Sequence, residues 1–337
     1  MSAGRATPNL SRIAASLGVS PATVSNALSG KGRVSAEVAN RIRAVADAAG
    51  YMPSQAARAL RTGRSGVLGL VLPDISHPLF PQIAQAIEHA ASTAGYGVLI
   101  ADSRGDTALQ TDAIYRLIER GVDGIVIIPR LGTRIVDIGC PMAVIDSPST
   151  PGNTVSADHW QGGQQVADHL VSLGHRAFLL IGNNPLSNVQ NDRIGGIRSR
   201  LPAGVSAEVL WVEKHDAEHG AASSLGLATR VASGVTAFAC VSDLLALRAL
   251  TELQRAGVRV PEEVSITGFD DLAFSAAVTP ALTTVRMDLP RIARTAVDAL
   301  VQAIDLDAVP ATGSSGVPMH LVIRQTSAHP PGHPAAD

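Results

Sequence analysis

The stretch SLGVSPATVSNAL, residues 16–28, contains the end of one short helix, a glycine turn and the start of a second helix. Gly18 suits the left-handed conformation that ends a helix. Ser20 can cap the following helix, and Pro21 fits its first turn, where a missing N–H costs nothing. Upstream, apolar residues recur at the spacing of one helical face: Leu10, Ile13, Ala14 and Leu17. The pattern predicts two short helices joined by a tight turn.

A third short helix is expected directly after this pair. Ser35 can cap it, and it stops at Gly50. Its predicted buried face is Val38, Ile42, Val45 and Ala49. The second helix is expected to bury Val24, Ala27 and Leu28. Three short helices in about 50 residues are typical of a helix-turn-helix domain, and the chain is therefore expected to begin with one over residues 1–52.

Charge separates this head from the rest of the chain. Residues 1–66 contain nine basic and two acidic side chains, a net charge of +7, whereas the whole chain has a net charge of −2. A basic head on an acidic body indicates that the head binds a polyanion. Residues 53–65 have helical propensity but almost no apolar stripe, which predicts a hinge segment that folds only against a partner.

From residue 67 the pattern changes to apolar strands alternating with amphipathic helices. Strands are expected at 67–72, 97–102, 124–129, 142–146, 177–182, 208–212, 237–241 and 264–269. Helices are expected at 79–94, 107–120, 159–173, 216–232 and 243–257. This alternation is typical of parallel, doubly wound sheets. Because about 260 residues exceed one such sheet, the sequence predicts an α/β body of two doubly wound parallel-sheet lobes with a cleft between them.

Several functional classes lack their signals in this sequence. There is no glycine-rich dinucleotide motif and no phosphate loop, so no cofactor is expected. Cys140 and Cys240 have no metal-ligand spacing, and we expect them to be buried thiols without a metal. No signal peptide and no membrane span are expected, which favours a cytoplasmic protein. Without a nucleophile–base pair, the sequence favours a non-enzyme.

Several motifs, in order, then identify a resemblance that covers residues 9–326. They are IAASLGVSPATVSNAL, RVSAEVANRIRAVADAAGYMPSQAARALRTGRSGVLGLVLPDISHPLF, GVDGIVIIP, HLVSLGHRAF, VSDLLALRAL and PEEVSITGFDD. The sequence resembles the lactose-repressor (LacI/GalR) family of bacterial transcription factors. The resemblance implies a homodimeric repressor of a palindromic operator, with a periplasmic-binding-protein-like body that senses a small molecule such as a sugar.

The resemblance also implies which residues touch operator DNA. Pro21, Ala22 and Asn26 would face the bases, with Thr23 and Ser25 near the phosphates. Asn26 stands where the family often has arginine or histidine, and asparagine pairs best with adenine. A contact of Asn26 with phosphate stays an alternative. Leu60 matches the leucine that such hinge helices wedge into the central base step, or else packs on the body. The full predicted set is Ser20, Pro21, Ala22, Thr23, Ser25, Asn26, Arg33, Ser54, Ala57, Arg58, Leu60 and Arg61.

Effector contacts are expected at the carboxyl ends of the body's strands, where ligands of such sheets bind. The predicted set is Asp74, His77, Phe80, Trp160, Arg193, Ser242 and Asp270. The resemblance implies that Arg193 and Asp270 hold hydroxyls or a carboxylate of the ligand, with Ser242 contributed by the second lobe and Phe80 as an apolar wall. Trp160 is a possible stacking face, on its position alone. Alternatives stay open: Asp270 or Asp243 as a helix cap, Arg193 as a surface arginine, and Trp160 as a packing residue. Ser242 and His159 both stand where the family often has asparagine.

The predicted domains follow from these patterns. The hinge joins the head to an effector-binding and dimerisation domain over residues 66–326. Its two lobes are expected to combine distant segments: 66–157 with 289–316, and 158–285 with 317–326. Residues 327–337 are expected to be disordered. Three alternatives remain: control by a protein co-regulator, a transporter-type solute-binding protein, which the basic head disfavours, and activation instead of repression.

Overall fold

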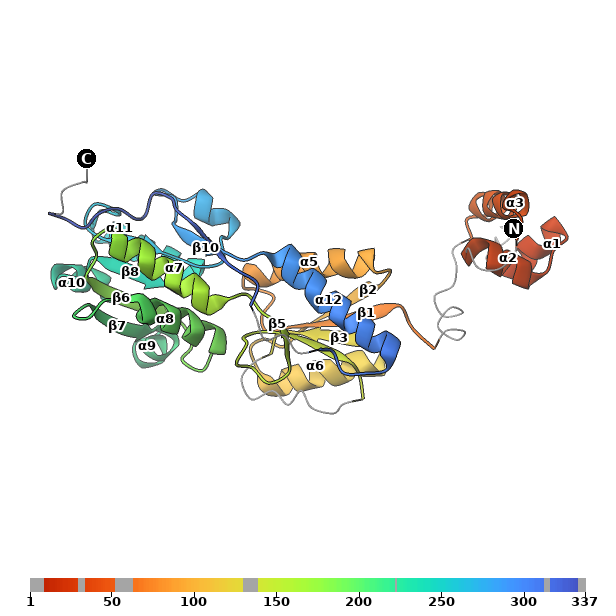
Figure 1. Cartoon of the computed structure of the whole chain (residues 1–337), viewed down its shortest axis with the longest axis horizontal. Coiled ribbons are helices and arrows are strands. Elements are labelled where there is room, and N and C mark those ends of the chain that lie inside the picture. Colours follow the sequence, from red (N-terminus) through yellow and green to blue (C-terminus); the bar gives the residue numbers. More distant parts are fainter. Residues whose placement is uncertain are drawn as a thin grey trace, which may run out of the picture. The chain divides into compact units, whose positions relative to one another are not determined.

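The computed structural model describes residues 9–29, 34–51, 63–129, 139–221, 223–311 and 316–332. The chain divides into two compact units, Met1–Ser65 and Gly66–Asp337. The described residues of the first unit form helices without strands, whereas the second unit contains two parallel sheets with their helices (Figure 1). The expected fold class, a helix-turn-helix head with an α/β body of two parallel-sheet lobes, is confirmed.

The first unit is a bundle of the three short helices that the sequence predicted. They are α1 (Leu10–Leu17), α2 (Pro21–Ser29) and α3 (Ala36–Ala48). The Asn9 side chain caps α1 by accepting a hydrogen bond from the backbone N–H of Arg12, and Gly18 ends α1 with a φ of 66°. Ser35 caps α3 as expected, by accepting from the N–H of Val38. Local chemistry therefore fixes where each of these helices begins or ends.

The core of the first unit is small and aliphatic. Its buried residues are Ile13, Ala14, Val24, Ala27, Ala39, Ile42 and Ala46. The predicted buried face of α3 is partly wrong, because Val38 and Val45 are half-buried and Ala49 is exposed. The small side chains of Ala39 and Ala46 take the centre, where they allow the neighbouring helices to pack closely.

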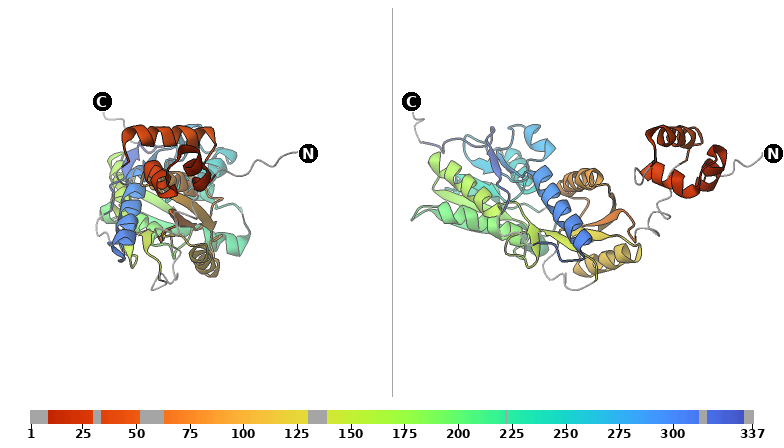
Figure 2. Two further views of the ribbon diagram at one scale, coloured as in Figure 1. Left: turned by 90° about the vertical axis from the view of Figure 1, so that its right-hand side faces the viewer. Right: turned by 45° about the vertical axis from the view of Figure 1, so that its right-hand side comes forward.

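The first lobe of the body, called the N-lobe below, is a five-stranded parallel sheet of order β2-β1-β3-β4-β5. Its strands are β1 (Val67–Leu72), β2 (Gly97–Asp102), β3 (Gly124–Ile127), β4 (Met142–Ile145) and β5 (Asn153–Val155). Its helices are α5 (Leu79–Thr93), α6 (Thr107–Glu119) and α12 (Leu289–Leu306). Helices α5 and α12 cover one face of the sheet and α6 covers the other (Figure 2).

The second lobe, called the C-lobe below, is a four-stranded parallel sheet of order β7-β6-β8-β9. Its strands are β6 (Ala177–Gly182), β7 (Ser206–Trp211), β8 (Ala237–Cys240) and β9 (Ser265–Thr267). Its helices are α7 (His159–Ser172), α8 (Asn188–Arg200), α9 (Val212–His219), α10 (Leu227–Ala232), α11 (Asp243–Arg255) and the short 3-10 helix η1 (Ala273–Ala276). An antiparallel pair, β10 (Thr284–Arg286) and β11 (His320–Val322), completes it.

Glycines allow α7 and α8 to pack unusually closely. A Cβ atom added to Gly163 on α7 would lie 2.2 Å from the carbonyl oxygen of Arg193. A Cβ atom on Gly196 of α8 would lie 2.1 Å from the carbonyl oxygen of Trp160. Any larger residue at either position would push the helices apart. This close approach sets the position of Arg193, which α8 carries into the centre of the body.

Two sequence predictions for the body are corrected by the structure. The single helix expected at 216–232 is two helices, α9 and α10. Gly220, with a φ of 95°, ends α9, and Gly226, with a φ of 68°, precedes α10. The prediction that residues 327–337 are disordered is wrong for the first residues of this segment. The backbone N–H of Ala328 donates to Ser265 Oγ at 3.0 Å, and its carbonyl oxygen accepts from that hydroxyl.

Candidate functional site

The α2 helix presents the predicted base-reading residues on its exposed face. Pro21, Ala22 and Asn26 are exposed, while Val24 and Ala27 on the opposite side are buried. The Ser20 hydroxyl accepts from the backbone N–H of Thr23 at 3.1 Å and lies 2.9 Å from its hydroxyl. This serine therefore fixes the start of the helix, and Thr23 and Ser25 are half-buried beside it. The helix has the geometry of a major-groove reader.

Other predicted DNA contacts fall outside the part of the chain that the structure describes. These are Arg33, Ser54, Ala57, Arg58, Leu60 and Arg61. Among the described residues of the first unit, Arg12, Arg41 and Arg43 are exposed and basic. Arg43 donates to Asn40 Oδ1 at 3.0 Å. Exposed guanidinium groups of this kind are suited to contacts with DNA phosphates.

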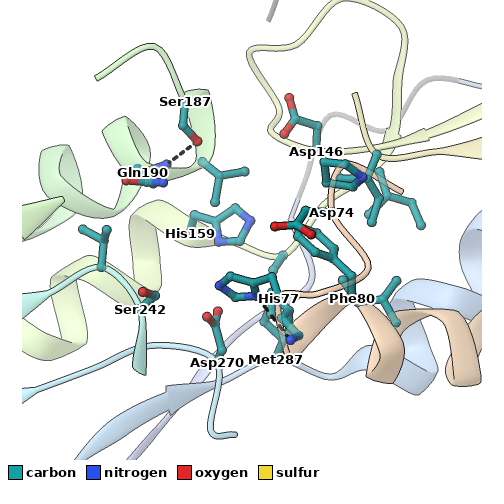
Figure 3. Close-up of a pocket in the computed structure, with 18 of the residues that line it drawn as sticks. Asp74, His77, Phe80, Asp146, His159, Ser187, Gln190, Ser242, Asp270 and Met287 are labelled. Atoms are coloured by element: carbon teal, nitrogen blue, oxygen red, sulfur yellow. Dashed lines mark hydrogen bonds between the residues drawn. The ribbon is translucent and has the colours of Figure 1, made fainter. Parts of the chain in front are cut away.

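A cavity of about 380 Å³ lies between the two lobes of the body (Figure 3). Side chains from both lobes line it. Of the seven predicted effector residues, six are brought together there: Asp74, His77, Phe80, Arg193, Ser242 and Asp270. The volume falls within the range of small-molecule sites. Each of Asp74, Ser242 and Asp270 follows the carboxyl end of a strand in its sheet, where the strand-end rule places ligands.

Arg193 forms the buried centre of the cavity's C-lobe side. Its Nη1 donates to the Val241 carbonyl oxygen at 2.6 Å, and its Nε donates to His159 Nδ1 at 3.3 Å. Its Nη2 lies 3.1 Å from Asp270 Oδ1 in an ion pair whose side chains are 5 % and 2 % exposed. The guanidinium also stacks on the Phe269 ring, 4.7 Å from its centroid. The alternative of a surface arginine is wrong.

His159 can accept this hydrogen bond only as a neutral imidazole. Burial and the nearby charge of Arg193 lower its pKa well below the ordinary value. Its Nδ1 therefore carries a lone pair toward Arg193, and its proton sits on Nε2. Because Asp270 pairs with Arg193 without a hydrogen bond to Oδ1, that buried oxygen keeps acceptor capacity at the cavity. Arg193, His159 and Asp270 thus form a fixed polar group.

The N-lobe side of the cavity is built from the loop before α5 and from the end of β4. Asp74 Oδ1 accepts from the N–H and the hydroxyl of Ser76 at 2.9 and 2.6 Å. The rings of His77 and Phe80 lie 5.4 Å apart, and burial lowers the pKa of His77. Asp146 follows β4, and burial raises its pKa to about 6.

The structure corrects the remaining predictions for this site. Trp160 does not line the cavity and is 46 % exposed. Its ring covers Gly195 on α8, where an added Cβ atom would lie 2.4 Å away. The position of Trp160 one residue after His159 turns it onto the outer face of α7. It is therefore a packing residue, as the alternative reading proposed.

The proposed helix caps are corrected as well. Ser242 both lines the cavity and caps α11, by accepting from the N–H of Leu245 at 3.4 Å. Asp243 is the first residue of α11 and turns into the protein instead of capping it. Asp270 caps no helix either, because the residue before η1 is Leu272. The predicted effector contact of Ser242 is thus compatible with its observed role as a helix cap.

Several cavity residues were not predicted as contacts. They are Asp146, His159, Asn183, Asn184, Ser187, Gln190 and Met287. Asp146 follows a strand, so the strand-end rule could have found it. His159 was noted only for its difference from the family pattern. Ser187 and Gln190, at the start of α8, carry no signal in a single sequence.

Together, an exposed helix-turn-helix reader and a two-lobed ligand cavity define a ligand-responsive DNA-binding regulator. Residues 9–54 match the family described as bacterial regulatory proteins, lacI family, and residues 167–327 match the periplasmic binding protein-like domain. The protein is 33 % identical to the HTH-type transcriptional regulator MalR of Streptomyces coelicolor, over 97 % of this chain and 98 % of the relative. The chain belongs to the lacI family of bacterial transcriptional regulators.

Other relatives and solved structures agree with this assignment. The regulator DegA of Bacillus subtilis is 31 % identical, over 81 % of this chain and 84 % of the relative. The Lac repressor bound to ONPG in its repressed state is 25 % identical with a TM-score of 0.79, covering 96 % of this chain and all of the repressor chain. These relatives are named as regulators and not as enzymes. Among the described residues, no helix is long and apolar enough to cross a membrane.

Proposed function

We propose that the protein is a homodimeric repressor of a palindromic operator and acts in the cytoplasm. Its affinity for DNA would depend on a small, hydroxyl-rich effector. One observation carries this proposal: a cavity lined from both lobes, with a buried Arg193–Asp270 pair, lies in the same chain as an exposed reading helix. A solved relative in fold, the Lac repressor, is described as a dimer bound to operator and an anti-inducer. The effector's chemistry follows from the cavity.

The charges of the cavity favour an uncharged effector. Among its lining residues that the structure describes, Asp74, Asp146 and Asp270 are acids and Arg193 is the only arginine or lysine. Each nitrogen of the Arg193 guanidinium faces a protein partner. A phosphate or carboxylate would therefore enter a negative site without a cation to pair with. Hydroxyl groups would donate to these carboxylates instead.

Structures of similar fold support a sugar-like effector. One is the regulator CelR in complex with cellobiose, with a TM-score of 0.67, 24 % identity and coverage of 95 % of this chain and 99 % of that one. Another is a LacI family regulator from Enterococcus faecium with bound ribose. The apolar lining of this cavity includes Phe80, Ile83 and Met287. Such surfaces suit the carbon faces of a sugar ring, while the carboxylates suit its hydroxyls.

For the DNA, we propose that Asn26 reads adenine in each half-site and that Leu60 enters the central base step. Asparagine is the side chain that pairs bidentately with adenine N6 and N7, and Asn26 lies on the exposed face of α2. Arg58, Arg61 and Arg64 would contact phosphates, so that affinity falls steeply with salt. Effector binding would shift the population of lobe arrangements and, with it, the order of the hinge segment.

The test begins with selection of bound duplexes from a random pool by the full-length protein. A palindrome is expected, and Asn26→Ala should relax one position in each half-site by about 1–3 kcal/mol. Uniform weakening of all duplexes would instead assign Asn26 to phosphate. The selected duplex is then titrated in the presence of ribose, cellobiose and other neutral sugars, beside their phosphorylated counterparts. A response to phosphorylated sugars alone would overturn the uncharged effector.

A further inference from the structure

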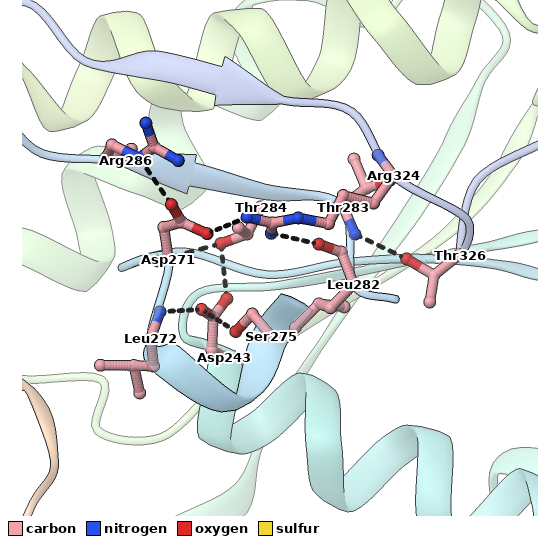
Figure 4. Close-up of polar contacts among 10 residues, drawn as sticks. All are labelled: Asp243, Asp271, Leu272, Ser275, Leu282, Thr283, Thr284, Arg286, Arg324 and Thr326. Carbon is pink, nitrogen blue, oxygen red and sulfur yellow. Dashed lines mark hydrogen bonds and ion pairs between the residues drawn. The ribbon is translucent and has the colours of Figure 1, made fainter. Parts of the chain in front are cut away.

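Two of the C-lobe residues that line the cavity just after a strand, Ser242 and Asp270, are each followed by an acid that turns into the protein (Figure 4). Asp243 follows Ser242 and is fully buried. Asp271 follows Asp270, and its side chain is 8 % exposed. Neither inward acid lines the cavity. Their partners show what these acids hold in place.

Asp243 fixes the turn after Asp270 through hydrogen bonds to its buried carboxylate. Its Oδ2 accepts from the backbone N–H of Leu272 at 2.8 Å and from the Ser275 hydroxyl at 2.6 Å. Its Oδ1 accepts from the Thr284 hydroxyl at 2.5 Å. These contacts connect the start of α11 to η1 and to β10. A buried carboxylate needs such donors to offset its lost hydration.

Asp271 holds the same turn through two arginines. Its Oδ2 accepts from Arg286 Nε at 2.5 Å, and its Oδ1 accepts from Arg324 Nη2 at 2.6 Å. Arg324 also donates through Nη1 to the Leu282 carbonyl oxygen at 2.8 Å. Both carboxylate oxygens are therefore occupied by charge-assisted hydrogen bonds, which are the stronger kind.

The backbone of this turn is strained. Asp270 has a φ of 103° and Asp271 a φ of 49°, and neither residue is glycine. Residues with a side chain rarely adopt this region, and they keep it only where surrounding contacts enforce it. The backbone N–H of Asp270 donates to the Val285 carbonyl oxygen at 2.8 Å. Two consecutive strained residues thus place the Asp270 carboxylate against Arg193.

The two arginines lie beside β10 and β11, the C-lobe strands that flank passages of the chain between the lobes. Arg286 is the last residue of β10, and α12 of the N-lobe begins three residues later at Leu289. Arg324 follows β11. Before β11, Val317 forms a parallel bridge with Ala157, which lies between β5 of the N-lobe and α7 of the C-lobe. The Asp271 carboxylate therefore joins the turn that carries Asp270 to the end of β10 and to the segment after β11.

We propose that Asp271 is a positioning residue that links the effector-facing turn to β10 and to the segment after β11, which flank the places where the chain passes between the lobes. Through Arg286 and Arg324 it makes the position of the Asp270 carboxylate depend on the angle between the lobes. Effector contact with Asp270 and closure of the lobes are thereby one event. The proposal rests on the proposed function for the effector role of Asp270.

A histidine across the cavity offers a readout that needs no effector and no DNA. His77 belongs to the N-lobe, and the charge of Asp270 on the C-lobe raises its pKa against the larger effect of burial, which lowers it. When Asp270 moves away from the N-lobe, the pKa of His77 falls further. Proton NMR titration of the full chain measures this pKa, and a His77→Gln variant assigns the signal.

Five variants complete the design. Asp270→Asn sets the full size of the shift. Arg286→Gln breaks one link, and the Arg286 side chain is more than half exposed. Asp271→Asn removes the negative charge that both links share. Arg230→Gln removes a surface pair with Glu208 on the same lobe and is the matched control. Combining Asp271→Asn with Arg286→Gln tests whether the two act through one contact.

The expected result is a fall in the pKa of His77 in Arg286→Gln and Asp271→Asn, reaching about a third or more of the Asp270→Asn shift. The double variant should fall no further than Asp271→Asn alone, and Arg230→Gln should match the original protein. If His77 titrates unchanged in both Arg286→Gln and Asp271→Asn, the proposal is wrong. A shift of equal size in Arg230→Gln would also overturn it, because the effect would then be general. A missing effector response would overturn the proposed function while leaving this result intact.

Discussion

The two sides of the cavity are built in different ways. On the C-lobe side, Arg193 bonds to His159, Val241 and Asp270, which lie 34 or more residues away in the sequence. On the N-lobe side, Asp74 and Asp146 accept hydrogen bonds from Ser76 and Thr150, two and four residues away.

The difference shows which half of the site is fixed in advance. Long-range bonds exist only once the whole C-lobe has folded, and together they leave the side chains little freedom. Bonds within a loop move with that loop. The C-lobe therefore presents a rigid polar group, and we expect the N-lobe carboxylates to adjust more readily to a ligand. Preorganisation of one side lowers the entropic cost of binding.

The largest expected effect comes from breaking the rigid side. Arg193→Ala leaves the Asp270 carboxylate buried without its cation, which should cost about 3–5 kcal/mol of stability. Chemical denaturation of the full chain measures this loss. Arg193→Lys is the matched variant, since it keeps the charge but not the forked geometry. Equal stability of Arg193→Ala and the original protein would contradict the rigid arrangement.

A smaller loss of stability is expected from a substitution on α8 at a residue that does not itself line the cavity. Gly196→Ala places a Cβ atom against the backbone of Trp160, and overpacking of this kind costs about 1–3 kcal/mol. Thermal unfolding should show the loss. The control is Gly97→Ala, where an added Cβ atom meets nothing within 4 Å. If both variants melt at the same temperature, the helices are not held by glycine contact.

The N-lobe side of the cavity should make effector affinity depend on pH. Burial raises the pKa of Asp146 to about 6, so its carboxylate is charged at pH 7.5 and becomes neutral as the pH falls to 5. Hydroxyls of the effector bond more strongly to the charged form, so affinity should decrease with falling pH. Asp146→Asn should weaken binding about tenfold at pH 7.5, or about 1.4 kcal/mol.

Calorimetry at both pH values measures this effect. Because His77 also lies in the cavity, the comparison of Asp146→Asn with the original protein isolates the contribution of Asp146. The variant should show a flatter pH dependence. An unchanged dependence in the variant would assign the titration to another group.

The smallest effect is expected at Trp160. Since this residue lies outside the cavity, Trp160→Ala should change effector affinity by no more than about twofold, well under 1.4 kcal/mol. Its loss of stability should be less than the roughly 3–5 kcal/mol of a fully buried tryptophan, because 46 % of the residue is exposed. A large loss of affinity with normal stability would return Trp160 to the binding site.

Much of the fold was predictable because its strands are continuous apolar runs. The bounds of β1, β2 and β6 match the predictions, since each is a six-residue strand of a parallel sheet. The strands β5, β10 and β11 were missed; each has only three residues, as has β9, which was predicted as part of the longer stretch 264–269. Such short segments carry no periodicity, and their pairing depends on distant parts of the chain.

Residues of the cavity were predictable from the sequence where a polar side chain directly follows a predicted strand. Asp74, Ser242 and Asp270 were found by that rule, and Asp146 satisfied it without being chosen. Side chains that reach the cavity from a helix, such as Gln190, depend on how α8 packs against α7, and only the folded structure shows it.

The most direct test of the account measures the affinity of the selected operator duplex with and without the best neutral sugar, in the original protein and in Asp270→Asn. We expect the sugar to change operator affinity about tenfold or more, a coupling of about 1.4 kcal/mol, in the original protein. In Asp270→Asn the ratio of the two affinities should fall close to one. A ratio that stays the same in both proteins would show that the effector does not act through this cavity.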